Sequence, residues 1–299
     1  MPALIASCAR KNAWTIRRRQ ASAELEGYRV MVSKPSYAQL IIALIPAALL
    51  AAYLGVALWA RRVDLALPLW LKICWSYYIA VVLHVTTMGL FGTLWLKVPI
   101  ELLSYGFGKR WLRISIAAVP ISFGILPFGG SVKFVGDEPQ NEPKLDGWQR
   151  SLVELSGCAA LLALAAVIMG RHATFDVLGI WRQFIEGALS PFGHAQVLLR
   201  DLGHYLAGLD ELSILSAMSF GMAAINLLPF PLLNGGNAIM YFVNSMLSPV
   251  TPRDQEWLFR AGLSATLLGY GSWFLALLFL AYDSWVKTSL HSLAHSALA

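Results

Sequence analysis

The sequence alternates between long apolar runs without charge and shorter segments that hold most of its charged residues. Uncharged apolar runs lie at 37–60, 73–96, 155–170 and 261–282. A helix rises 1.5 Å per residue, so about 20 apolar residues cross a hydrocarbon core of about 30 Å. The pattern therefore predicts a membrane-spanning helix at each run, the one at 155–170 being short.

The uncharged run at 114–132 does not read as a helix. It contains Pro120, Pro127 and the pair Gly129–Gly130, and β-favouring residues such as Ile114 and Val119 occupy its first half. Proline and glycine interrupt helices, whereas β-branched residues favour strands. We predict a re-entrant β-hairpin at 114–134, which membrane depth tolerates only where protein covers the backbone.

The run at 212–252 has 41 residues without a charge and is too long for one membrane helix. Pro229, Pro231 and the pair Gly235–Gly236 divide it near its centre. We predict a helix followed by a non-helical centre and a second half-helix, together a broken helix at 212–247. The expected fold class is an all-α polytopic membrane protein with about five transmembrane helices, a re-entrant β-hairpin and one broken helix.

The composition supports a membrane protein. Apolar residues make up 57% of the 299 residues, charged residues 13%, and the mean hydropathy is +0.60. Soluble domains average about 45–50% apolar and about 25% charged residues, and a folded soluble surface cannot hide such an excess. This excludes a soluble or disordered class. Cys8, Cys74 and Cys158 show neither a disulfide framework nor metal-ligand spacing.

The net charge of +6 is better explained by membrane topology than by nucleic-acid binding, which we do not predict. The segment 97–150 carries seven Lys and Arg residues, whereas 171–211 carries three, with five acidic residues. Basic loops stay in the cytoplasm. We expect an integral protein of a bacterial plasma membrane, with a cytoplasmic N-terminus and an external C-terminus.

The chain divides by these features into four parts. Residues 1–36 form a basic cytoplasmic tail, 37–69 an additional N-terminal span, and 70–260 a membrane core that includes interfacial helices at 171–211. Residues 261–299 form the last span and a tail. Asp201 and His204 near His194, and the pair His291 and His295, have helical spacing, but neither set offers a complete metal-ligand set, and we interpret them as solvated helix faces.

Three stretches carry a family resemblance through their order and spacing. Residues 82–89 read V-L-H-V-T-T-M-G, residues 126–134 read L-P-F-G-G-S-V-K-F, and residues 225–237 read I-N-L-L-P-F-P-L-L-N-G-G-N. The set resembles the site-2 protease family of intramembrane metalloproteases over roughly 79–244. That family carries H-E-x-x-H, P-x-G-G-Y-V-K and N-L-L-P-x-P-x-L-D-G-G-H in this order.

The resemblance also implies that the catalytic chemistry has changed. His84 stands at the family's first zinc-binding histidine, Val85 at its catalytic glutamate, Met88 at its second histidine and Asn234 at its aspartate ligand. Valine cannot accept a proton, and neutral thioether and amide groups are poor zinc ligands. We expect no catalytic residues, no metal and no cofactor. We expect His84 to be a neutral histidine whose hydrogen bonds are made within the protein.

The frame around these positions remains, which predicts a non-catalytic protein that binds membrane segments of partners. Its predicted binding residues are Phe128, Gly129, Gly130, Ser131, Asn226, Pro229, Pro231 and Asn237. The alternative is an active intramembrane metalloprotease with altered ligands, in which zinc would use His84. A lesser alternative is a conduit for small solutes or ions, lined by His84, Thr86, Thr87, Asn226 and Asn234. Besides His84, the sequence predicts no acid or base inside the membrane.

Overall fold

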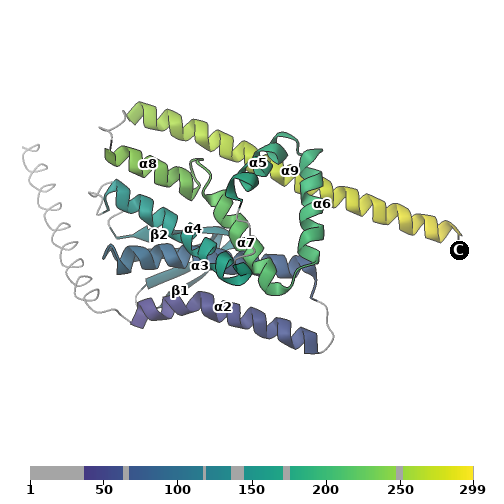
Figure 1. The fold of residues 1–299 in the computed structure, drawn as a ribbon, viewed down its shortest axis with the longest axis horizontal. Helices are drawn as coiled ribbons and strands as arrows, with labels where there is room; N and C mark the ends of the chain where they lie inside the picture. Colours follow the sequence, from purple (N-terminus) through teal and green to yellow (C-terminus); the bar gives the residue numbers. More distant parts are fainter. Residues whose placement is uncertain are drawn as a thin grey trace, which may run out of the picture.

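The structure is a computed structural model that describes residues 37–62, 67–116, 119–135, 145–170, 176–246 and 252–298 (Figure 1). The basic tail predicted at 1–36 lies outside the described residues. Helices and one β-hairpin make up the described chain, which confirms the predicted class of a helical membrane protein with a hairpin.

Four of the described helices are long and apolar enough to cross a membrane. They are α2 (Tyr37–Arg62), α3 (Leu69–Leu94), α4 (Gly147–Met169) and α9 (Pro252–Leu298). Of these four, α3 has the most buried span, and it packs against α2, α4 and the hairpin. The other three expose apolar side chains over most of their spans, as lipid-facing helices do.

The predicted broken helix consists of α7 (Glu211–Asn226) and α8 (Asn234–Met246). With 16 residues, α7 is about 24 Å long and shorter than the four spans. The chain between the two helices turns sharply and brings the start of α8 close to the backbone before it. A Cβ on Gly235 would collide with the carbonyl of Leu227, and one on Gly236 with the carbonyl of Phe230. Only glycine lets α8 begin this close to the preceding backbone.

The hairpin is longer than the predicted range, because its first strand begins before residue 114. Strand β1 (Ile100–Ile116) pairs antiparallel with β2 (Val119–Phe134). The sequence had assigned the residues around Lys109, Arg110 and Arg113 to a cytoplasmic loop because of their charge. In the sheet, these three side chains are exposed, so they do not interrupt the strand.

The hairpin folds back on itself near its base. Leu103, Ser104 and Tyr105 each have two partners, one in the first half of β2 and one in the second half. Tyr105, for example, is opposite both Phe123 and Gly130. The first half of β1 therefore lies between two segments of β2, and the second half of β2, residues 126–134, forms an outer strand. Leu103 and Tyr105 are fully buried against α3.

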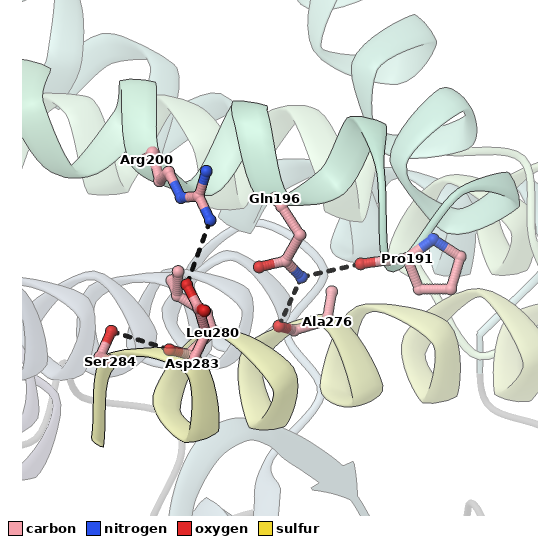
Figure 2. A network of polar contacts seen from close by, with 7 residues as sticks. All are labelled: Pro191, Gln196, Arg200, Ala276, Leu280, Asp283 and Ser284. Carbon is pink, nitrogen blue, oxygen red and sulfur yellow. Dashed lines mark hydrogen bonds and ion pairs between the residues drawn. The ribbon is translucent and has the colours of Figure 1, made fainter. Parts of the chain in front are cut away.

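Two shorter helices, α5 (Val177–Leu189) and α6 (His194–Ala207), connect α4 to α7 within the segment predicted to contain interfacial helices. They hold α9 through polar contacts (Figure 2). Gln196 Nε2 donates to the carbonyls of Pro191 and Ala276, both at 2.8 Å, and Arg200 pairs with Asp283 at 3.4 Å. The C-terminal part of α9 extends past the other helices (Figure 1).

Candidate functional site

His84 lies in the third quarter of α3, where the helix is enclosed by the rest of the bundle, and is 4% exposed. It faces Gly157 of α4. A Cβ at Gly157 would stand 2.6 Å from His84 Nδ1, so the glycine is what allows the imidazole to pack against α4. Nδ1 has no hydrogen-bond partner among the described residues. The expectation that hydrogen bonds within the protein satisfy His84 therefore stays a prediction.

Asn234, the first residue of α8, points to the same place from the broken helix. Its Nδ2 donates to Glu154 Oε2 at 2.7 Å and to the Glu154 carbonyl at 3.1 Å, and it lies 3.5 Å from Met88 Sδ. Asn234 and the Gly157 backbone are also the polar neighbours of the His84 ring. The structure thus brings together His84, Met88 and Asn234 from α3 and α8.

Glu154 is the residue that sequence reasoning missed. The predicted span begins at 155, so Glu154 falls in the charged segment before it, and besides His84 no acid or base is predicted inside the membrane. In the structure, Glu154 lies within α4, one helical turn before Cys158 and one after Arg150, which is a nearby positive charge. The predicted span was too short at its start because a hydropathy boundary follows charge, whereas the candidate membrane helix α4 extends back to Gly147.

Val85, the residue after His84, lies on the side of α3 that packs against the hairpin, in the same buried cluster as Met88. It is fully buried in the cluster formed by α3, α2 and the hairpin. A Cβ on Gly130 would come within 2.7 Å of Val85 Cγ2 and would collide with the Ser104 carbonyl. The outer strand of the hairpin therefore passes directly over the residue that stands at the family's catalytic position.

The remaining predicted binding residues are divided between the hairpin and the broken helix. In the hairpin, Gly129 has a φ of 67°, Gly130 is partly buried and Ser131 is exposed, while the side chain of Phe128 lies outside the described residues.

In the broken helix, Asn226 ends α7 and Pro229 is exposed. The Pro231 carbonyl accepts a hydrogen bond from Thr266 Oγ1 at 2.9 Å, and the backbone N–H of Asn237 donates to the Leu233 carbonyl at 2.9 Å. Thr86 contacts the hairpin through Tyr105 Oη at 2.8 Å.

Helix α5 packs against the broken helix. Phe184 packs against Leu228 and Leu233, and Trp181 Nε1 donates to the Ala224 carbonyl at 2.6 Å. The indole N–H thus provides a partner for a carbonyl near the end of α7, where the last carbonyls of a helix have no intrahelical partner. The backbone of the broken helix is therefore supported by α5 and, at Pro231, by α9.

The sequence model of Peptidase family M50 matches residues 77–269, which is more than half of the chain. The chain belongs to peptidase family M50. A search of curated proteins found no match. The family match extends from α3 into the first part of α9 and includes the hairpin, the site and the broken helix, so it confirms the resemblance to site-2 proteases.

The zinc ion that the M50 family implies does not fit the side chains at this site. Among the described residues, no group of three or more His, Cys, Asp and Glu residues is placed to hold a metal. Catalytic zinc sites use three protein ligands. Here His84 and Glu154 are the two groups of suitable chemistry, and Asn234 presents its amide donor, not a carboxylate, toward the centre of the cluster. At the surface, His194 pairs with Glu186 at 3.4 Å.

Proposed function

We propose that this M50-family membrane protein is non-catalytic and binds extended membrane segments of partner proteins along the outer strand of its hairpin. The observation that carries this proposal is the hydrogen bond from Asn234 Nδ2 to Glu154 Oε2, 2.7 Å long. It means that a neutral donor stands where the active family places an anionic ligand, while the frame around that position is fully built.

The chemistry at the site supports the absence of catalysis. The family's general base is replaced by Val85, which is enclosed by apolar side chains. Loss of a positioned general base typically costs about 10²–10⁴ in rate. Glu154 does not restore that base, because its carboxylate is occupied by Asn234. Among the described residues, the site thus offers neither the family's proton acceptor nor a third charged ligand.

The outer strand supports the binding role. Residues 126–134 of β2 pair on one side with residues 100–107 of β1, and no other described segment pairs with them. An exposed strand edge presents unpaired backbone N–H and C=O groups, which an extended peptide can satisfy by adding a strand. Inside a membrane this addition gains more than in water, because lipid cannot hydrogen-bond the peptide backbone.

The position of this edge supports the same role. Gly130 touches Val85, and the Phe134 ring lies where a Cβ on Gly92 would be, so the outer strand runs along α3 beside the site. Lys133 Nζ pairs with Glu101 Oε1 at 2.7 Å, which fixes the strand against β1. An added strand would therefore lie next to the position where the active family cleaves its substrates.

Site-specific photo-crosslinking in native membranes tests the binding role. A photo-reactive amino acid at Ser131 is expected to capture a membrane segment of a partner, and the same group at Lys133 should capture a residue two positions away on that segment. This spacing identifies strand pairing, because alternate residues share one face. The control position is Val167 on α4, which is 81% exposed. Capture of lipid alone at Ser131, or equal capture at Val167, would refute the proposal.

The second candidate, a metalloprotease with altered ligands, is favoured by one observation: the Glu154 carboxylate and the His84 ring share Asn234 as a neighbour. Metal analysis of the detergent-purified protein tests it. We expect less than one zinc in ten chains, and no His84-dependent cleavage of a membrane-peptide substrate. The positive control is the triple variant Met88→His, Glu154→Gln and Asn234→Asp, which presents two histidines and an aspartate and should take up about one zinc per chain. Stoichiometric zinc in the unmodified protein, lost in His84→Ala, would favour the second candidate.

A further inference from the structure

One part of the hairpin carries an unusual surface. We call residues 107–116 and 119–126 the distal hairpin. Large apolar side chains are exposed there, although Ile121 and Ser122 within the same range are fully buried. The exposed side chains are Phe107, Trp111, Leu112, Ile114, Ile125 and Leu126, with exposed fractions from 38% to 66%. Exposed apolar patches on proteins mark surfaces that contact a membrane or a partner.

Three cations interrupt this apolar surface. Lys109, Arg110 and Arg113 are exposed, and none of them contacts an acidic side chain among the described residues. A cationic side chain at the centre of a bilayer costs about 2.5–3.5 kcal/mol on insertion scales. The distal hairpin therefore belongs at the depth of the lipid headgroups, where phosphate is available and apolar side chains still reach the acyl chains.

The backbone gives the distal hairpin its own direction. Gly106 and Gly108 both have a φ of 84°, and the register of the sheet shifts between Tyr105 and Arg110. Such positive φ values favour glycine, and register shifts bend a strand. Beyond this bend, β1 pairs with β2 only from Gly124 to Val119, and Trp111 packs on Phe123 with ring centroids 6.4 Å apart.

We propose that the distal hairpin binds anionic phospholipids, with their phosphate groups on Lys109, Arg110 and Arg113 and with Trp111 at the headgroup level. Clustered basic residues near a membrane attract anionic lipids by about 1 kcal/mol per charge, and arginine binds phosphate with two parallel hydrogen bonds. Tryptophan is enriched at this depth. Charge complementarity and the integral position of the chain favour a lipid over a soluble acidic partner.

Lipid titration of the delipidated, detergent-solubilised full-length protein tests this proposal. Binding of phosphatidylglycerol and phosphatidylcholine is counted by native mass spectrometry. We expect the unmodified protein to bind phosphatidylglycerol at least tenfold more tightly. The variant Lys109→Gln, Arg110→Gln and Arg113→Gln should lose this preference, and Trp111→Ala should weaken binding of both lipids. Inorganic phosphate added at the same concentration should not displace the lipid, because it lacks acyl chains.

The matched control removes the same charge elsewhere. The variant Arg62→Gln, Arg182→Gln and Arg200→Gln loses three exposed cations outside the hairpin and should keep the preference. The single variants Arg110→Gln and Arg113→Gln should each lose part of it, which keeps the test valid if the triple variant folds poorly. Equal binding of both lipids by the unmodified protein, or an unchanged preference in the triple hairpin variant, would overturn the proposal.

Discussion

Asn234 shows how a single substitution changes what a site can hold. An aspartate at this position would place a second carboxylate against Glu154, and two like charges at hydrogen-bonding distance disfavour each other. The asparagine instead donates to Glu154, so the pair is electrostatically compatible without a metal. The donor and the acceptor come from α8 and α4, which means that this hydrogen bond also fastens the broken helix to the bundle.

We therefore expect Asn234→Ala to lower the free energy of unfolding by about 1–3 kcal/mol, because it leaves the Glu154 carboxylate without its donor. Glu154→Gln should cost less, since a glutamine carbonyl still accepts from Asn234. Unfolding in mixed micelles of detergent and dodecyl sulfate measures both values. If both variants lost equal stability, the hydrogen bond would not be the cause of the loss. A double-mutant cycle of Asn234→Ala with Met88→Ala would then show whether packing between these two side chains causes it.

The sequence located three of the four clustered side chains and missed the fourth. His84, Met88 and Asn234 were found because motifs are defined by spacing within one helix or one loop, which sequence retains. Glu154 belongs to no motif, and its proximity to Asn234 depends on how α4 packs against α8. That contact joins residues 80 positions apart, and nothing local in the sequence encodes it.

At the scale of helices, glycine sets the distance between α3 and α4. The backbone of α4 approaches the His84 side chain at Gly157, and the His84 carbonyl would be 2.9 Å from an added Cβ there. Small residues let membrane helices approach closely and gain van der Waals contact. Gly221 of α7 provides a matched comparison, since nothing lies within 4 Å of the position of its Cβ.

Gly157→Ala is expected to lower stability by about 1–3 kcal/mol, because the added methyl group forces α3 and α4 apart. Gly221→Ala should raise stability by up to about 1 kcal/mol, since alanine is the better helix former and meets no neighbour. The same mixed-micelle unfolding measurement compares them. If Gly157→Ala stabilised the protein as much as Gly221→Ala does, α4 would be able to move away from His84 without loss of stability.

The N-terminal ends of α3 and α7 are joined by an ion pair that the sequence did not reveal. Lys72 Nζ lies 3.0 Å from Glu211 Oε1, and the glutamate side chain is only 8% exposed. Lys72 precedes the uncharged run predicted at 73–96, and Glu211 precedes the run at 212–252. Both therefore stand just outside the predicted apolar runs, although each lies in the first turn of its helix.

Lys72→Met is expected to cost about 3–5 kcal/mol, because it leaves the Glu211 carboxylate buried beside an apolar side chain. The double variant Lys72→Met with Glu211→Leu should recover much of this loss, since it removes both charges and keeps the volume. Thermal unfolding of the purified proteins in one detergent measures the difference. A double variant less stable than the single one would show that Glu211 depends on partners other than Lys72.

Over the whole molecule, the hairpin and the α5–α6 pair pack on different helices. The hairpin packs on α3, whereas α5 and α6 contact α9, and α5 also packs on the loop between α7 and α8. The order of apolar runs was sufficient to predict the helices, because hydropathy acts along the chain. It did not predict this arrangement, which depends on side chains such as Trp181 and Gln196 reaching distant carbonyls.

The orientation in the membrane follows from the distribution of basic residues and can be tested with the exposed side chains of this fold. We expect the distal hairpin to be cytoplasmic and α5 to be on the outer side. In a variant without native cysteines, Lys109→Cys should react with a membrane-impermeant maleimide only after right-side-out vesicles are opened. Arg182→Cys, whose parent side chain is 76% exposed, should react in sealed vesicles. The reverse labelling pattern would place the basic hairpin outside and would contradict the predicted topology, because the same two positions cannot exchange sides without inverting every span between them.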